Sequence, residues 1–240
     1  MSPFRILRPA GASPFVLLCD HASNFVPDEF HCLGLPHHEL NRHIAWDIGA
    51  AGVTEVLSEL LDAPAILCNT SRLVVDCNRQ LHAPGLIPEV SDGTVIPGNL
   101  TLSEAARQDR LRRWFHPYHR AIEDIIEGRP TLIAVSIHSM TPSLGGQHRP
   151  WQIAFSSYAS NRSLSDRLIE ELRRPGDITV GDNQPYDLDP EVDYSVPAHA
   201  LSRHLPYVQV EFRQDEVTLA AQQISWAERF AQALVSLSLS

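Results

Sequence analysis

The sequence predicts an α/β protein in which helices cover both faces of a mixed central sheet, a three-layer αβα sandwich. Short apolar runs typical of buried strands alternate along the chain with longer amphipathic stretches typical of helices. The 240 residues are enough for one substantial core. No internal repeat, low-complexity tract or linker divides them. We therefore expect a single domain over residues 1–240.

Each element is predicted from its own pattern. Strands are expected at apolar runs bounded by turn residues: 15–19, 64–68, a short run at 73–75, 131–137, 151–155, 178–180 and 207–212. Helices are expected where apolar residues share one face: 46–61, 103–126, 161–173 and from about 217 onward. Pro117 predicts a kink in the second of these helices. Residues 22–43 and 82–100 lack periodicity and are predicted to be loops.

The charge of the chain excludes several classes of function. The formal net charge is −10, and the sequence holds no basic run. Nucleic acids and anionic membranes both require clustered positive charge, so neither is an expected partner. All 19 basic residues are arginines. The absence of lysine excludes Schiff-base chemistry, pyridoxal-phosphate attachment and a phosphate-loop lysine, while arginine suits bidentate recognition of carboxylates.

The cysteines and the N-terminus indicate an intracellular setting. The four cysteines form no Cys-x-x-Cys pair, and those at positions 19 and 68 lie in predicted strands, so reduced and buried thiols are expected. The sequence has no signal-like N-terminus and no apolar run of membrane-spanning length. We expect a cytoplasmic enzyme. The sequence does not indicate an oligomeric state.

Three predicted strands end in residues that carry chemistry. Asp20 and His21 follow the strand 15–19, His138 follows the strand 131–137, and Glu211 lies at the end of the strand 207–212. Ligand sites of open α/β sheets gather beyond the carboxyl ends of the strands. The sequence therefore predicts a functional site at this edge of the sheet.

Two histidines and a carboxylate around an open position form a common catalytic zinc site. His21 and His138 are the expected nitrogen ligands of Zn²⁺, the alternative for each being a hydrogen-bonded core histidine. Asp47 is the expected third ligand, the alternative being a helix N-cap. Asp20 is expected to orient a ligand through a hydrogen bond rather than to bind the metal.

The remaining candidates are a glutamate and a group of arginines. A half-buried Glu211 would have a raised pKa and would suit a general base, the alternative being an ion pair with Arg213. Arg72, Asn78 and Arg79 supply donors that can stabilise an oxyanion or hold a substrate carboxylate, the alternative being surface residues of a loop.

Nucleophilic catalysis is not indicated, because the chain lacks a Gly-x-Ser-x-Gly elbow. His116 and His119 lie within the aromatic stripe of the helix 103–126, with Pro117 between them. We therefore interpret these two histidines as packing residues rather than as a ligand pair.

At these positions the chain resembles the N-formylglutamate amidohydrolase family, which is similar to the zinc carboxypeptidases and aspartoacylases. Five segments carry the resemblance, in order: Cys19-Asp-His-Ala-Ser-Asn-Phe-Val-Pro27, Ala45-Trp-Asp47, Ser71-Arg-Leu-Val-Val-Asp-Cys-Asn-Arg79, Ser136-Ile-His-Ser139 and Val210-Glu-Phe-Arg-Gln-Asp215. They span most of the chain, and Asp-x-Asn-Arg is the most specific of them. The resemblance implies a phosphorylase/hydrolase-like αβα fold.

The resemblance also implies roles for these residues. His21 and His138 would bind zinc, Glu211 would be the general base, and Arg72 would polarise the scissile carbonyl. The substrate-binding residues would be Asn78 and Arg79, which hold the α-carboxylate, together with Arg213 and Ser139. The wider carboxypeptidase group has a glutamate ligand three residues after its first histidine, where this chain has Asn24. The formylglutamate branch has an aspartate where Asp47 falls, which is why Asp47 is expected to complete the site.

The leading hypothesis is zinc-dependent hydrolysis of the amide bond of a small anionic N-acyl amino acid, with N-formyl-L-glutamate giving formate and L-glutamate as the named case. One alternative is a metallohydrolase of the same fold that acts on another N-acyl amino acid or a short peptide. The other alternative is a non-catalytic carboxylate-binding protein, which is favoured only by Asn24 at the position of the glutamate ligand.

Overall fold

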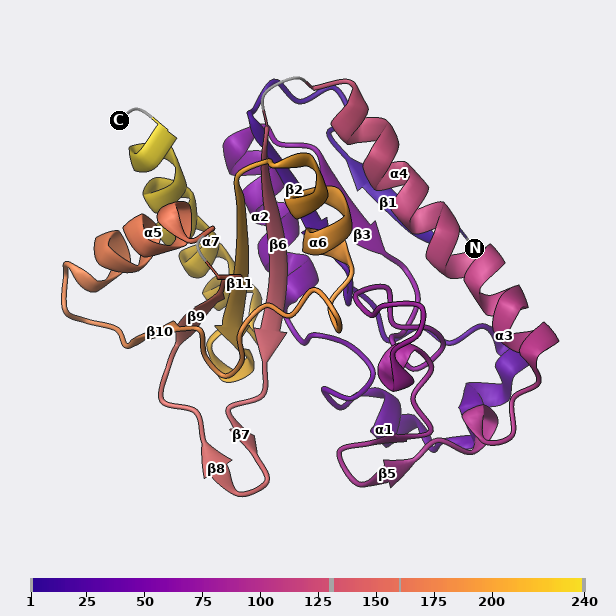
Figure 1. Ribbon diagram of the computed structural model, residues 1–240. Helices are drawn as coiled ribbons and strands as arrows, with labels where there is room; N and C mark the ends of the chain where they lie inside the picture. Colours follow the sequence, from indigo (N-terminus) through magenta and orange to yellow (C-terminus); the bar gives the residue numbers. More distant parts are fainter. Residues whose placement is uncertain (1, 130–131, 160, 239–240) are drawn as a thin grey trace.

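The computed structural model describes residues 2–129, 132–159 and 161–238. Its centre is a seven-stranded mixed sheet in the order β1-β3-β2-β6-β11-β9-β10 (Figure 1). In that order the strands are Phe4–Leu7, Ala65–Cys68, Phe15–Cys19, Ile133–Met140, Tyr207–Arg213, Ile153–Ser156 and Val180–Asp182. The four strands β3, β2, β6 and β11 are parallel, whereas β1 pairs antiparallel with β3 and β9 antiparallel with β11. The predicted mixed α/β sheet is confirmed.

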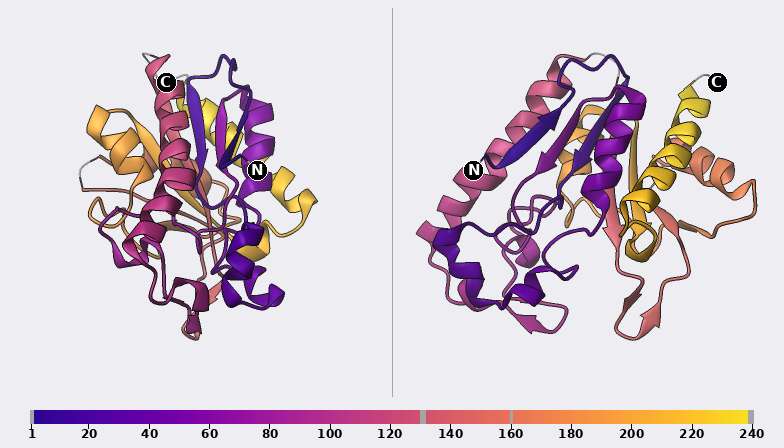
Figure 2. Two further views of the ribbon diagram at one scale, coloured as in Figure 1. Left: turned by 90° about the vertical axis from the view of Figure 1, so that its right-hand side faces the viewer. Right: turned by 180° about the vertical axis from the view of Figure 1, so that it is seen from behind.

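Helices cover both faces of this sheet (Figure 2). The helices are α1 (His37–Leu40), α2 (Ala50–Leu61), α3 (Glu104–Arg110), α4 (His116–Glu127), α5 (Ser163–Arg173), α6 (Ser195–His199) and α7 (Ala220–Ser238). Helices α2, α5 and α7 pack against alternate strand residues such as Leu17, Val135 and Val210. Helices α4 and α6 cover the opposite face, where Leu18 and Ala134 point. The side-chain alternation of the strands thus builds two apolar layers.

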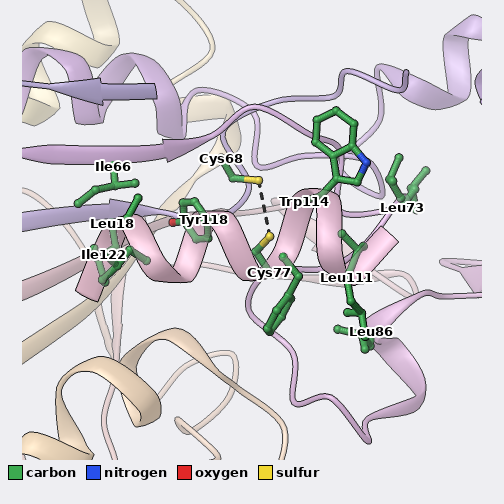
Figure 3. Packing of buried hydrophobic residues seen from close by; sticks show 14 of the residues in the cluster. Leu18, Ile66, Cys68, Leu73, Cys77, Leu86, Leu111, Trp114, Tyr118 and Ile122 are labelled. Carbon is green, nitrogen blue, oxygen red and sulfur yellow. Dashed lines mark hydrogen bonds between the residues drawn. The ribbon is translucent and has the colours of Figure 1, made fainter. Parts of the chain in front are cut away.

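A π-helical turn joins α3 to α4 at Leu111–Phe115, immediately before Pro117. Pro117 has no backbone N–H to donate, and this wider π-helical turn lies next to the position of the predicted kink. The side chains of α4 pack on β2 and β3, where Tyr118 and Ile122 lie against Leu18 and Ile66 (Figure 3).

The four cysteines are free, as expected. The Sγ atoms of Cys68 and Cys77 lie 3.7 Å apart in the core beneath α4 (Figure 3). In the described part of the chain, no helix combines the length and the apolarity needed to cross a membrane.

The predicted strand at 73–75 is wrong. Leu73, Val74 and Val75 are fully buried, but their segment forms turns, because Val74 N–H donates to the Ser71 carbonyl and Asp76 N–H to the Leu86 carbonyl. These three residues are apolar because they are buried in an irregular segment, and not because they pair in the sheet. The pattern of β-branched residues cannot separate these two cases.

Other boundaries differ by a few residues. The helix predicted from residue 46 begins at Ala50, and the last helix begins at Ala220. The predicted loops contain short elements: a 3-10 turn at Asp28–Gly34 and α1 in the first, and a small hairpin of β4 (Val90–Ser91) and β5 (Thr94–Val95) in the second. Strand β1 and the hairpin of β7 (Ser143–Leu144) with β8 (Gln147–His148) were not expected. The predicted first residue of the long strand, at position 131, lies outside the described residues.

Candidate metal centre and active-site cavity

The candidate site lies at the carboxyl ends of three adjacent parallel strands. His21 follows β2, His138 lies in β6, and Glu211 lies in β11 opposite His138 in the pairing register. Strand β2 has β3 on one side and β6 on the other, so the chain leaves β2 for one half of the sheet and returns on the other half. A ligand crevice is expected at such a switch in strand order.

His21, Asp47 and His138 form a buried cluster of three groups able to hold a metal ion. Oδ2 of Asp47 lies 3.3 Å from Nδ1 of His21 and 2.9 Å from Nδ1 of His138. Tetrahedral zinc with ligands at about 2.0–2.1 Å holds its donor atoms about 3.3 Å apart. The two distances from Asp47 are close to this spacing, and the ligand atoms of all three side chains lie within 4.8 Å of one another, so the cluster could hold one metal ion.

The far side of each imidazole faces a carboxylate. Nε2 of His21 lies 2.7 Å from Oδ1 of Asp76. Nε2 of His138 lies 3.0 Å from Oγ of Ser136 and 3.4 Å from Oδ2 of Asp20. A carboxylate at Nε2 favours a proton there and leaves the Nδ1 lone pair for a metal. Asp20 thus lies beside His138 rather than beside its sequence neighbour His21, and its orienting role stays a prediction.

The side chain of Asp47 does not cap a helix. The N-cap of α2 is Gly49, and no side chain caps this helix end. The carboxylate of Asp47 faces the two histidines and accepts a hydrogen bond from Ser139 N–H at 3.2 Å. Gly49 has φ +84°, and a Cβ there would lie 2.2 Å from the Val217 carbonyl oxygen. The turn that aims Asp47 into the site therefore requires glycine two residues later.

The carboxylates and imidazoles of the cluster shift one another's pKa values. Burial alone would raise the pKa of Asp47, but the charge of His21 and hydrogen bonds to both histidines hold that pKa well below its ordinary value. Burial would lower the pKa of His138, but hydrogen bonds to Asp20 and Asp47 raise it well above its ordinary value. Without a metal, the carboxylates thus stabilise protonated histidines, and a bound cation would take the place of these protons.

Glu211 lies beside this cluster and is buried. Burial raises the pKa of Glu211 to about 7, against the opposing charge of His138. Its predicted alternative, an ion pair with Arg213, does not form, because the Arg213 guanidinium binds Asp215 and Glu216. A carboxyl group with this pKa can accept and return a proton near neutral pH.

A cavity of about 450 Å³ opens on the cluster. The segment 183–194, between β10 and α6, forms one of its walls and passes near the carboxyl ends of β6 and β11 (Figure 1). The lining residues are His21, Asp47, Arg72, Asn78, Arg79, His138, Ser139, Tyr186, Asp187, Asp189, Val192, Asp193, Gln209 and Glu211. The cavity thus brings together all but one of the site residues predicted from the sequence.

The sequence profile of the N-formylglutamate amidohydrolase family matches residues 13–218. The chain belongs to this family. Membership makes it a hydrolase that acts on an amide bond. No curated protein sequence matches the chain at a significant level.

Solved structures share the fold of this chain. A gene product of Agrobacterium tumefaciens is 32% identical, with a TM-score of 0.93 over 99% of this chain and 97% of the other. An N-formylglutamate amidohydrolase from Ralstonia eutropha is 18% identical, with a TM-score of 0.78 over 99% and 97% of the two chains. A bacteriophage poly-gamma-glutamate hydrolase is 12% identical, with a TM-score of 0.50 over 99% and 90%. The last two likenesses show the fold alone.

The two arginines that line the cavity, Arg72 and Arg79, form ion pairs with carboxylates of the chain. Arg72 binds Asp76 through Nε at 2.9 Å and Nη2 at 2.7 Å, and its Nη1 lies 3.4 Å from Oδ1 of Asp47. Nη1 of Arg79 donates to Oδ1 of Asp193 at 2.8 Å. The carbonyl oxygen of the Asn78 side chain accepts from the backbone N–H groups of residues 194 and 195. These residues are held in place rather than being free on a loop surface.

Three further residues singled out in the sequence make hydrogen bonds to backbone carbonyls of the chain: Arg213, Ser139 and Asn24. Arg213, the predicted residue that is not on the cavity wall, donates from Nη1 to the Arg149 carbonyl at 3.2 Å. Ser139 lines the cavity, but its hydroxyl donates to the Ile48 carbonyl at 2.8 Å. The amide of Asn24 donates to the Leu40 carbonyl at 2.9 Å, so Asn24 supports the loop 22–43.

Several residues of the site carry roles that the sequence did not reveal. Asp76 lies in the arginine-rich segment, yet nothing in the spacing showed that it would bind both His21 and Arg72. Asp20 accepts hydrogen bonds from the hydroxyls of Tyr118 and Ser195 at 2.9 and 2.6 Å. These partners come from distant parts of the chain, where no local pattern marks them.

Of the two histidines interpreted as packing residues, His119 is confirmed, whereas the interpretation is wrong for His116, whose side chain is exposed. His119 is buried against Phe115 and Tyr194. Its ring nitrogens lie 2.9 Å from Nε2 of His199 and 2.9 Å from the Cys77 carbonyl. Burial and the neighbouring His199 lower the pKa of His119 to about 3, so this ring is neutral.

Proposed function

We propose that the chain hydrolyses the linear amide of a small N-acyl amino acid, with zinc held by His21, Asp47 and His138, and that N-formyl-L-glutamate is its substrate. One observation carries the proposal: Glu211, with its pKa near 7, lies beside a metal-ligand cluster in the cavity that also contains Arg72, Asn78 and Arg79. Family membership supports the same reaction.

A bound zinc ion would polarise the scissile carbonyl as a Lewis acid and lower the pKa of the attacking water. Glu211 takes a proton from that water and returns it to the leaving amine, because its buried carboxyl group lies beside the metal-ligand cluster in the same cavity. Arg72 faces the same space with a guanidinium held rigid by Asp76, and it stabilises the negative charge that develops on the carbonyl oxygen.

Arg79 and the amide N–H₂ of Asn78 bind the α-carboxylate of the substrate. The Asn78 amide nitrogen lies 3.4 Å from the same Asp193 oxygen that accepts from Arg79, so both donors converge on one position. A carboxylate there accepts charge-assisted hydrogen bonds. Of the other two predicted substrate-binding residues, Ser139 lines the cavity beside Asp47 and would contact the substrate there, whereas Arg213 is not on the cavity wall.

The test is turnover of N-formyl-L-glutamate by zinc-loaded protein, with release of formate as the readout. We expect Glu211→Gln to lower kcat by about 10²–10⁴-fold with zinc content unchanged, because it removes the general base alone. Glu191→Gln is the matched control: it changes the same side-chain type at an exposed position outside the cavity.

A panel of N-acyl amino acids tests the choice of substrate. If the wild-type protein hydrolyses another member of the panel but not N-formyl-L-glutamate, that other compound is the substrate instead. Bound zinc without turnover of any panel member would overturn the proposed reaction. A stoichiometric zinc supply that leaves the protein metal-free would overturn the zinc site.

A further inference from the structure

The position proposed for the substrate carboxylate already contains a carboxylate of the chain itself. Oδ1 of Asp193 lies 2.8 Å from Nη1 of Arg79 and 3.4 Å from Nδ2 of Asn78. These are the two donors that converge on one point of the cavity wall. An anionic substrate that binds there must compete with Asp193.

The backbone around Asp193 is fixed by contacts that do not involve its carboxylate. The side-chain oxygen of Asn78 accepts from Tyr194 N–H at 3.1 Å and from Ser195 N–H at 2.9 Å. The side-chain amide of Gln80 donates to the carbonyls of Pro190 and Asp193, both at 2.9 Å. The carboxylate can therefore leave Arg79 by side-chain rotation while the wall of the cavity stays in place.

The ion pair between Asp193 and Arg79 does not fully compensate the burial of the carboxylate. Burial raises the pKa of Asp193, and the charge of Arg79 offsets only part of this effect. The other carboxylate oxygen of Asp193, Oδ2, accepts one hydrogen bond, from Asp189 N–H at 3.1 Å. A carboxylate that is only partly compensated is a displaceable partner for Arg79.

Arg72, the other arginine that lines the cavity, does not replace Arg79 as a binding partner for the substrate carboxylate. Arg72 is bound by Asp76 and faces Asp47. Further carboxylates on the wall, those of Asp187 and Asp189, would repel an anionic substrate. Arg79 is thus the cation for which the substrate and Asp193 compete.

We propose that Asp193 is a specificity-determining residue that occupies the substrate-carboxylate site and exchanges with the carboxylate of an incoming N-acyl amino acid. The proposal rests on the proposed function. It implies that Asp193 weakens the binding of every substrate and product with an α-carboxylate and leaves the chemical step unchanged. Such a residue favours ligands whose carboxylate binds Arg79 better than the internal one does.

The experiment compares wild type with Asp193→Asn in zinc-loaded protein. We expect the KM for N-formyl-L-glutamate to fall about tenfold in the variant with kcat within about twofold, because ground-state and transition-state binding improve equally. Calorimetry with L-glutamate should show a matching fall in Kd. The α-amide of L-glutamate lacks the competing carboxylate, so its Kd should not change.

Matched variants separate the exchange from other effects. Glu191→Gln removes the same charge from the same segment at an exposed site, and it should leave KM and Kd unchanged. Adding Asp193→Asn to an Arg79→Gln variant should bring no further gain. Asp193→Ser, which keeps a hydroxyl for Asp189 N–H, serves as a second variant, and thermal unfolding checks that both remain folded.

An unchanged or higher KM and Kd in both Asp193 variants would overturn the exchange, as would an equal gain from Glu191→Gln. Failure of the proposed function gives a different result. If no N-acyl amino acid is hydrolysed, the L-glutamate titrations still compare wild type with the variants. In that case, tighter binding by Asp193→Asn supports the exchange, and equal or undetectable binding in both proteins overturns it.

Discussion

The carboxylate of Asp76 joins His21 to Arg72. Its Oδ1 atom lies 2.7 Å from Nε2 of His21. Its Oδ2 atom accepts a hydrogen bond from Nε of Arg72 and lies 2.7 Å from Nη2 of the same guanidinium. Burial would raise the pKa of Asp76, but the charges of Arg72 and His21 hold it well below the ordinary value. One ionised side chain thus contacts a proposed metal ligand and a proposed catalytic arginine together.

The first prediction concerns this link. Asp76→Asn removes the negative charge that fixes the Nε2 proton of His21, and we expect zinc affinity to fall about 10–100-fold. Competition with a metal chelator at fixed pH measures the change. Asp177→Asn, which alters an exposed carboxylate bound to Arg229, is the control. Equal zinc affinity in the Asp76 variant and wild type would contradict the orienting role.

The sequence predicted the sheet and the location of the site because both depend on local patterns. The apolar runs of β2, β6 and β11 are continuous, and polar residues stand where these strands end, so His21, His138 and Glu211 could be placed at one edge. The choice of Asp47 also followed from the sequence, by resemblance, although the structure was needed to show that its carboxylate faces the two histidines rather than capping a helix.

The rest depends on contacts between distant segments. Asp76 binds His21 across 55 residues of sequence, and Asp193 binds Arg79 across 114. No spacing rule links such pairs. The strand predicted at residues 73–75 was wrong for a related reason. These residues are buried in the apolar core without pairing in the sheet, and a strand-like composition does not distinguish the two cases.

The second prediction concerns protons at the metal cluster. Hydrogen bonds and charges from Asp20, Asp47 and Asp76 raise the pKa values of His21 and His138 despite burial, which acts to lower them. Zinc must displace these protons, so its affinity should rise with pH, by about tenfold per pH unit for each proton released. Calorimetry in buffers of different ionisation enthalpy counts the protons.

An exposed histidine provides the control for that titration. His148→Ala should leave the number of released protons unchanged, because this side chain lies on the β7–β8 hairpin away from the cavity. Zinc affinity that is constant between about pH 6 and pH 8 would contradict protonated ligands in the metal-free protein.

The third prediction links Glu211 to stability. Burial raises its pKa from 4.5 to about 7, so the folded metal-free protein binds a proton that the unfolded chain has lost. The free energy of unfolding therefore falls as the pH rises from about 4.5 through about 7. Glu211→Gln removes this titration, and the metal-free variant should exceed wild type in stability at pH 8 by on the order of 1–3 kcal/mol.

Urea unfolding in the presence of a chelator at pH 5 and pH 8 measures this difference. At pH 5 most of the Glu211 side chains are protonated, so variant and wild type should be similar. A stability gain that is equal at the two pH values would show that packing, rather than ionisation of the buried carboxyl group, causes the effect.

The fourth prediction concerns the turn that presents Asp47. Gly49 has φ +84°, and an added Cβ would lie 2.2 Å from the Val217 carbonyl oxygen. Gly49→Ala thus combines a strained backbone with a steric clash, and we expect a loss of about 2 kcal/mol or more in the free energy of unfolding. Zinc affinity should fall as well, because the clash displaces the segment that holds Asp47.

Gly93 offers a matched control for the backbone contribution. Its φ is +75°, yet a Cβ there would meet no atom within 4 Å. Gly93→Ala should therefore cost only about 1 kcal/mol, the price of a left-handed conformation for alanine, with zinc affinity unchanged. If the two variants lose the same stability and bind zinc equally well, close packing of Gly49 against Val217 is not what positions Asp47.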